Sequence, residues 1–144
     1  MNYEQSIDYI HSIPKFRRPL GNVNLEKLLT HLDNPQKKLK FIHIAGTNGK
    51  GSTAAMTAEI LKKSGFKTGL FTSPYLEVFN ERIRINGENI TDNDLAEYVT
   101  RVKTIMEENN ALVSEFAFIT AVSFLYFYEK QCDIVVLEVG MGGK

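Results

Sequence analysis

The spacing of apolar residues along the chain changes between the period of a helix and the period of a strand. It predicts helices over residues 3–12, about 25–32 and about 115–130, and another after a capping box at 91–94. The helix after the capping box places Leu95, Val99, Val102 and Met106 on one face. The helix at 115–130 is apolar nearly all round, so we expect it to be the most buried. Apolar runs at 40–46, 67–72 and 133–140 predict strands.

The order of these elements predicts a parallel sheet. A glycine-rich loop and a helix over 50–64, which Gly65 ends, separate the first two strands. Strand, loop, helix and strand make a βαβ unit, and such units imply parallel strands. The continuous apolar run at 133–140 is typical of a central strand, and Asn86-Gly87 predicts a hairpin turn. The sequence therefore predicts one α/β domain over 1–144, with an open, mainly parallel sheet flanked by helices.

Composition and charge exclude several classes of protein. The chain has 144 residues, and its 17 Lys and Arg balance 17 Asp and Glu, so no global field attracts nucleic acid or anionic membranes. The most apolar stretch, 116–128, is too short to cross a bilayer, and the N-terminus has no signal-peptide pattern. Cys132 is the one cysteine, which favours a reducing compartment. We expect a cytoplasmic protein with no nucleic-acid or membrane partner.

Residues 42–56, IHIAGTNGKGSTAAM, have the features of a phosphate-binding loop. Glycines let backbone N–H groups approach a polyphosphate closely, and Lys50 adds a cation where a helix begins. Ser52 and Thr53 place hydroxyls in the first helical turn, within reach of phosphate oxygens or Mg²⁺. The spacing departs from G-x-x-x-x-G-K-[ST], because Gly51 stands between the lysine and the hydroxyl. The alternative is a tight turn between strand and helix with a surface lysine.

A second candidate site lies at the ends of the two later strands. Glu138 comes at the C-terminal end of the run at 133–140, and Ser73 follows the run at 67–72. Ligands of open α/β sheets bind outside those strand ends, and Mg²⁺ prefers carboxylate, hydroxyl and water oxygens. The two residues are therefore candidate metal ligands. A turn cap for Ser73 and a structural role for Glu138 are the alternatives.

Four stretches together resemble a known family. HIAGTNGKGST, FTSPYL, ERIRING and LEVGMGG resemble, in order and rough spacing, the N-terminal part of folylpolyglutamate synthase/dihydrofolate synthase. That family belongs to the Mur ligase superfamily of ATP-dependent amide-forming ligases. The resemblance runs through essentially the whole chain, and the unusual loop spacing is the family's own pattern. It implies a P-loop NTPase-like fold, here an incomplete Mur-ligase central domain, and a monomer.

The resemblance also implies a set of site residues. Lys50 would be catalytic, neutralising the β- and γ-phosphates, and Ser73 and Glu138 would hold Mg²⁺. The segment from Ser73 through ERIRING would form a mobile loop near the folate substrate. For Phe116, the family's aromatic wall for the pteridine competes with plain core packing. The residues implied for ATP are Thr47, Asn48, Gly49, Lys50, Gly51, Ser52 and Thr53, and those for folate or pteroate are Pro74, Tyr75, Arg82, Glu115 and Phe116.

Three departures from the family pattern stand out. The family usually has His where Tyr75 stands, and Glu where Ala117 stands. A glutamate at 117 would complete a capping box begun by Ser114, so a polar contact and a helix cap are expected to be lost. The chain also stops at Lys144, where the family continues into the rest of the ATPase domain, a further metal ligand, a carbamylated lysine and the C-terminal glutamate-binding domain.

By this resemblance, ATP phosphorylates a carboxylate of folate or dihydropteroate, and the amino group of L-glutamate attacks the acyl phosphate to give an amide, ADP and phosphate. The protein would serve folate biosynthesis and one-carbon metabolism. The 144 residues alone are expected to bind ATP and Mg²⁺ without ligating glutamate. Two alternatives stay open: a catalytically inactive nucleotide-binding fragment, and another Mur-type amino-acid ligase, although Gly51 after the lysine favours the folate branch.

Overall fold

A computed structural model describes residues 1–17, 23–45, 50–73 and 77–138, with only the backbone of residues 50–52. The chain divides into two compact units, one of residues 1–38 with 92–126 and the other of residues 39–91 with 127–144. Each is described by itself. Within the described ranges, every helix is too short or too polar to cross a bilayer.

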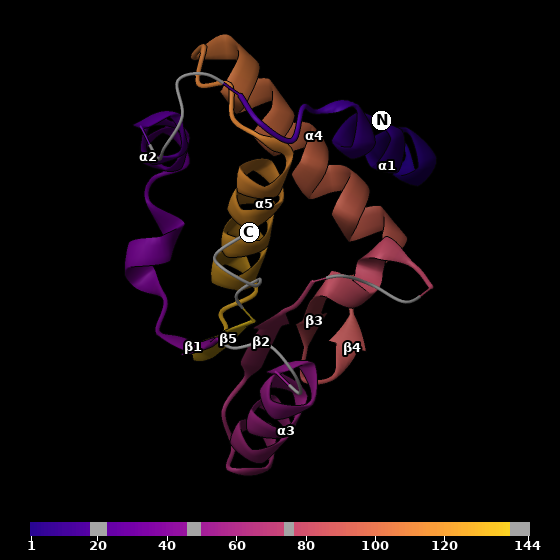
Figure 1. Ribbon diagram of the computed structural model, residues 1–144. Coiled ribbons are helices and arrows are strands. Elements are labelled where there is room, and N and C mark those ends of the chain that lie inside the picture. The colour runs from indigo at the N-terminus through magenta and orange to yellow at the C-terminus, as the bar shows by residue number, and fades with distance from the viewer. Residues whose placement is uncertain (18–22, 46–49, 74–76, 139–144) are drawn as a thin grey trace. The chain divides into compact units, whose positions relative to one another are not determined.

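The second unit is built on a five-stranded sheet with the order β1-β5-β2-β3-β4 (Figure 1). Its first three strands in this order are parallel, while β3 runs antiparallel to β2 and β4 antiparallel to β3. The mainly parallel sheet is thus confirmed, as is the central place of the last strand. The strand bounds are β1 Phe41–Ile44, β2 Thr68–Phe71, β3 Ile83–Ile85, β4 Glu88–Asn89 and β5 Ile134–Glu138.

The hairpin turn between β3 and β4 lies at the predicted Asn86-Gly87. Both residues have positive φ, 51° and 84°, as a two-residue type I′ turn requires. The side-chain oxygen of Asn86 also accepts a hydrogen bond from the N–H of Thr68, at 2.9 Å. The turn is therefore joined to the first residue of β2.

Helix α3, Lys50–Lys63, covers one face of the sheet. Ala54 on the helix packs with Leu70 of β2 and Val136 of β5, all buried, and Ile44, Ala58 and Leu61 surround them. Gly65, at φ 98°, follows the helix as predicted. On the opposite face, a Cβ added to Gly69 would come within 2.8 Å of the Phe127 ring, so only glycine fits this strand position.

The resemblance implied a loop from Ser73 through ERIRING, which ends at Gly87, but the second half of this stretch has regular structure and contains the hairpin that the spacing predicted. Residues Phe79–Arg82 form a short 3-10 helix, η2, and Ile83–Ile85 form strand β3. Phe79 and Ile83 are buried, at 3% and 0% exposure. Burial of these apolar side chains and pairing of β3 with β2 hold this stretch in regular structure.

The first unit is helical, with α1 Tyr3–Ser12, α2 Val23–His31, a 3-10 helix η1 at Pro35–Lys38, α4 Asp92–Glu108 and α5 Glu115–Glu129. The last residues of α5, from Phe127, count with the second unit. Helix α1 packs on α4, and Tyr9 meets Phe118 edge to face, with ring centroids 5.5 Å apart. The predicted apolar face of α4 is buried, with Leu95, Val99, Val102 and Met106 at most 1% exposed.

Candidate functional site

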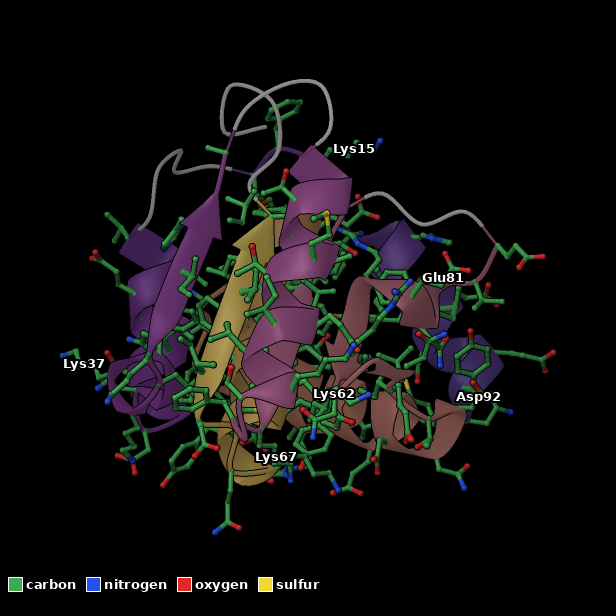
Figure 2. The ribbon with its side chains drawn as sticks, turned by 90° about the horizontal axis from the view of Figure 1, so that it is seen from below. Lys15, Lys37, Lys62, Lys67, Glu81 and Asp92 are labelled. Atoms are coloured by element: carbon green, nitrogen blue, oxygen red, sulfur yellow. The ribbon has the colours of Figure 1, made fainter. Side chains whose placement is uncertain are left out.

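The C-terminal ends of the three parallel strands meet at one edge of the sheet. In the register, Ile44 pairs with Glu138 and Phe71 with Leu137. In Figure 2 the arrowheads of β1 and β5 point toward the end of α3 that begins at Lys50. Because open parallel sheets bind ligands at this edge, it is the place to search for a site.

The structure brings Ser73 and Glu138 together at this edge, as predicted. The backbone N–H of Ser73 donates to Oε1 of Glu138 at 2.7 Å. Glu138 is the last residue of β5 and only 7% exposed, so its carboxylate lies within the protein rather than on its surface. A buried carboxylate needs hydrogen-bonding or a cation to offset desolvation, and the N–H supplies one such bond.

Thr72 and Arg82 hold the two ends of the segment that follows Ser73. The N–H of Thr72 donates to the carbonyl of Arg82 at 2.9 Å, and Nε of Arg82 donates back to the carbonyl of Thr72 at 3.2 Å. Arg82 is 9% exposed. Sequence reasoning missed Thr72, and no local signal identifies it, because its partner is ten residues away.

The side-chain oxygen atoms at this edge are of the kind that binds Mg²⁺. The carboxylate of Glu138 and the hydroxyl of Ser73 are hard oxygen ligands, and Mg²⁺ in nucleotide sites is held by one or two carboxylates together with phosphates and water. Within the part of the chain that the structure describes, no cluster of three or more His, Cys, Asp or Glu side chains is arranged to hold a metal. With one carboxylate, this edge is better suited to a Mg²⁺ ion that a polyphosphate also binds than to a metal ion held by protein ligands alone.

Most of the predicted phosphate loop falls outside the described residues. This holds for Thr47, Asn48 and Gly49, and for the side chains of Lys50, Gly51 and Ser52. The backbone shows that α3 begins at Lys50, directly after the loop. Thr53, in the first turn, is exposed. The loop's position between β1 and α3 agrees with the prediction, and the contacts of its side chains stay a prediction.

The residues predicted for folate lie in different places. Pro74 and Tyr75 fall outside the described residues, and Arg82 is buried next to Thr72. Glu115 and Phe116 begin α5, in the other unit. Phe116 is 43% exposed, which contradicts the alternative of core packing and leaves its ring accessible to a ligand.

The helix cap expected to be lost at Ala117 is half present. The N–H of Ala117 approaches Oγ of Ser114 at 3.4 Å. The reciprocal carboxylate of a capping box is missing, because residue 117 is alanine. The start of α5 therefore keeps a weak serine cap without the acidic side chain.

The thiol of Cys132 is poorly suited to nucleophilic catalysis, and the side chain of His43 is exposed. Burial raises the pKa of the Cys132 thiol from 9.0 to about 11; Asp133 adds to this and Lys67 opposes it, so the nucleophilic thiolate is scarce at neutral pH. His43, for which the sequence favours a packing role over a catalytic one, is exposed on β1, with its ring 6.4 Å from that of Phe41.

Comparisons with known proteins match the chain over nearly its whole length. It is 43% identical to the folylpolyglutamate synthase of Lacticaseibacillus casei over 148 residues, which cover 99% of this chain and 35% of that protein. It is 39% identical to the dihydrofolate synthase/folylpolyglutamate synthase of Bacillus subtilis (strain 168), covering 99% of this chain and 34% of the relative. No family model matches.

Solved structures of folylpolyglutamate synthases also match the chain over nearly its whole length. The folylpolyglutamate synthetase from Lactobacillus casei has a TM-score of 0.91 and 42% identity, covering 100% of this chain and 37% of that structure. A folylpolyglutamate synthase complex with AMPPCP and folate has a TM-score of 0.90 and 41% identity. The match covers 97% of this chain and 35% of that structure. The chain thus spans about a third of the length of the relatives that it matches.

Proposed function

Because the chain belongs to the family of folylpolyglutamate and dihydrofolate synthases, we propose that it carries the ATP- and Mg²⁺-binding part of a ligase that joins L-glutamate to folate or dihydropteroate. The observation that carries this proposal is the hydrogen bond between Ser73 and Glu138, 2.7 Å long, at the ligand-binding edge of the sheet. The bond joins a hydroxyl residue to a buried carboxylate, which supports a Mg²⁺ site at this edge. One related structure is a complex with AMPPCP and folate.

The proposed reaction has two steps. A carboxylate of the folate substrate attacks the γ-phosphorus of ATP, which gives ADP and an acyl phosphate. The amino group of glutamate then attacks the acyl carbon and releases phosphate, leaving an amide. When bound, Mg²⁺ would neutralise charge on the phosphate oxygens.

The chain's own residues act on ATP in this reaction by position and charge. Thr47 to Thr53 would supply backbone N–H groups and hydroxyls to the phosphates, with Lys50 as the catalytic cation. The N-terminus of α3 adds a favourable dipole. Ser73 and Glu138 would hold Mg²⁺. These are preorganised electrostatic contributions, which dominate phosphoryl transfer.

The folate side is proposed from the predicted set of Pro74, Tyr75, Arg82, Glu115 and Phe116. The exposed ring of Phe116 supports a stacking contact with a flat heterocycle. Glutamate ligation is proposed for a whole protein of the family's length, because the chain spans about a third of its relatives. The 144 residues by themselves are expected to bind nucleotide without ligating glutamate. A cytoplasmic monomer acting in folate metabolism is the setting that we propose.

Titration of ATP–Mg²⁺ into wild type and Lys50→Ala tests this function. We expect affinity to fall by about 10²-fold, the loss typical of a charged contact to transferring phosphate. Lys63→Ala is the matched control, because Lys63 lies at the other end of α3 and pairs with Glu59 on the surface. Equal affinity in wild type and Lys50→Ala would contradict the assignment of the phosphate loop.

A further inference from the structure

The segment after Ser73 is closed by a reciprocal pair of hydrogen bonds. Thr72 donates its N–H to the carbonyl of Arg82 at 2.9 Å, and Arg82 donates Nε–H to the carbonyl of Thr72 at 3.2 Å. The first bond joins two backbones, whereas the second depends on the arginine side chain. We call this pair the Thr72–Arg82 clamp. A lysine at position 82 would keep the first bond and lose the geometry of the second.

The guanidinium of Arg82 is fixed between aromatic rings. Its central carbon lies 5.7 Å from the ring centroid of Phe71 and 5.4 Å from that of Phe79. Both rings are buried, at 3% exposure each. A planar guanidinium stacks on such rings and keeps a fixed set of donors, which the flexible ammonium of lysine does not. The arginine side chain therefore has one orientation, with Nε toward Thr72.

The clamp adjoins the candidate metal site directly. Thr72 precedes Ser73, whose N–H binds Oε1 of Glu138 at 2.7 Å. A displacement of the Thr72 carbonyl rotates the peptide that carries this N–H, because both belong to the same planar unit. The orientation of the Ser73–Glu138 pair thus depends on the side chain of Arg82.

We propose that Arg82 is a positioning residue for the Ser73–Glu138 pair and acts on Mg²⁺ binding through the Thr72 carbonyl. This rests on the proposed function and sharpens it, because it assigns Arg82 to the metal side of the site instead of direct contact with folate. The burial of its side chain at 9% exposure supports the assignment. Residues that orient metal ligands in this way set metal affinity without touching the metal.

The test is a Mg²⁺ titration of nucleotide binding in the absence of folate, in wild type and Arg82→Lys. We expect the half-saturating Mg²⁺ concentration to rise about tenfold in Arg82→Lys, while nucleotide affinity in EDTA stays unchanged. Arg101→Lys is the matched control, because Arg101 also lies over a tyrosine ring, 5.0 Å from the centroid of Tyr98, but on the exposed side of α4. It should leave the Mg²⁺ titration unchanged.

Phe79→Leu provides a second variant in case Arg82→Lys folds poorly. It removes one ring above the guanidinium and keeps an apolar side chain, so it should raise the half-saturating Mg²⁺ in the same direction by a smaller factor. An unchanged Mg²⁺ titration with weaker folate binding would overturn the proposal in favour of direct contact. An equal loss of affinity with and without Mg²⁺ would overturn it in favour of a general structural role. If wild type itself shows no Mg²⁺-dependent nucleotide binding, the proposed function fails as well.

Discussion

The two edges of the parallel strands differ in the chemistry that they present. At the carboxyl edge, one buried carboxylate, Glu138, is held by a backbone N–H. Toward the amino edge, α3 and the β3–β4 hairpin enclose a hollow of about 160 Å³, with Lys62, Arg84 and Asn86 among its lining residues. Figure 2 shows Lys62 on α3, toward the end opposite the arrowheads of β1 and β5.

The difference shows that the hollow at the amino edge is not by itself evidence of a ligand-binding site. The hollow is lined by two cations, Lys62 and Arg84, but also by the carboxylate of Glu59. The side-chain oxygen of Asn86 already accepts a hydrogen bond from the N–H of Thr68. The carboxyl edge instead combines a desolvated charge, a helix N-terminus and convergent strand ends. Those are the features that bind a metal–nucleotide complex.

The strongest test of this comparison removes one acidic charge from each edge. Glu138→Gln should weaken Mg²⁺-dependent nucleotide binding by about a hundredfold, because an amide neither balances the metal's charge nor binds it well. Glu59→Gln should leave binding within about twofold, because Glu59 is exposed and its ion pair with Lys63 lies at the surface. Calorimetric titration at varied Mg²⁺ measures both. If the two variants weaken binding alike, the distinction between the edges fails.

A substitution at Gly69 in β2, between the two edges of the sheet, should lower stability without altering nucleotide binding. Gly69→Ala places a methyl 2.8 Å from the Phe127 ring, so we expect unfolding free energy to fall by about 1–3 kcal/mol. Urea denaturation gives this value. Combining Gly69→Ala with Phe127→Leu makes room for the methyl and should recover part of the loss, whereas a strictly additive loss would show that the contact is not the cause.

The smallest expected effect concerns Cys132, just before β5. Its pKa is raised to about 11 from 9.0, mainly by burial. A raised pKa favours the neutral thiol in the folded state, so its contribution to stability is complete below about pH 9 and decreases as pH rises toward 11. Iodoacetamide should modify the folded protein slowly at pH 8 and faster toward pH 11. Rapid modification at pH 8, without unfolding, would contradict the burial.

Local patterns in the sequence predicted the elements that depend on local chemistry. The central place of β5 follows from its continuous apolar run, and the hairpin from Asn86-Gly87. The proximity of Ser73 and Glu138 could be predicted as well, since parallel strands gather their C-terminal ends at one edge. The bounds of α1 and the buried face of α4 also agree with their spacing.

Contacts between distant residues could not be predicted where they do not follow from the parallel order of the strands. Nothing local shows that Phe79 is buried or that Arg82 reaches the carbonyl of Thr72. Contacts with residues distant in the sequence determine the burial of Phe79 and the position of Arg82.

The strand order also determines when the site can form during synthesis. Strands β1 and β2 are made first, but neither pairs with the other; each pairs with β5, which follows β2 by more than sixty residues. Until the ribosome has released residue 138, both strands have open edges facing a missing partner, and Ser73 has no carboxylate beside it. Such long-range pairing slows folding and exposes strand edges.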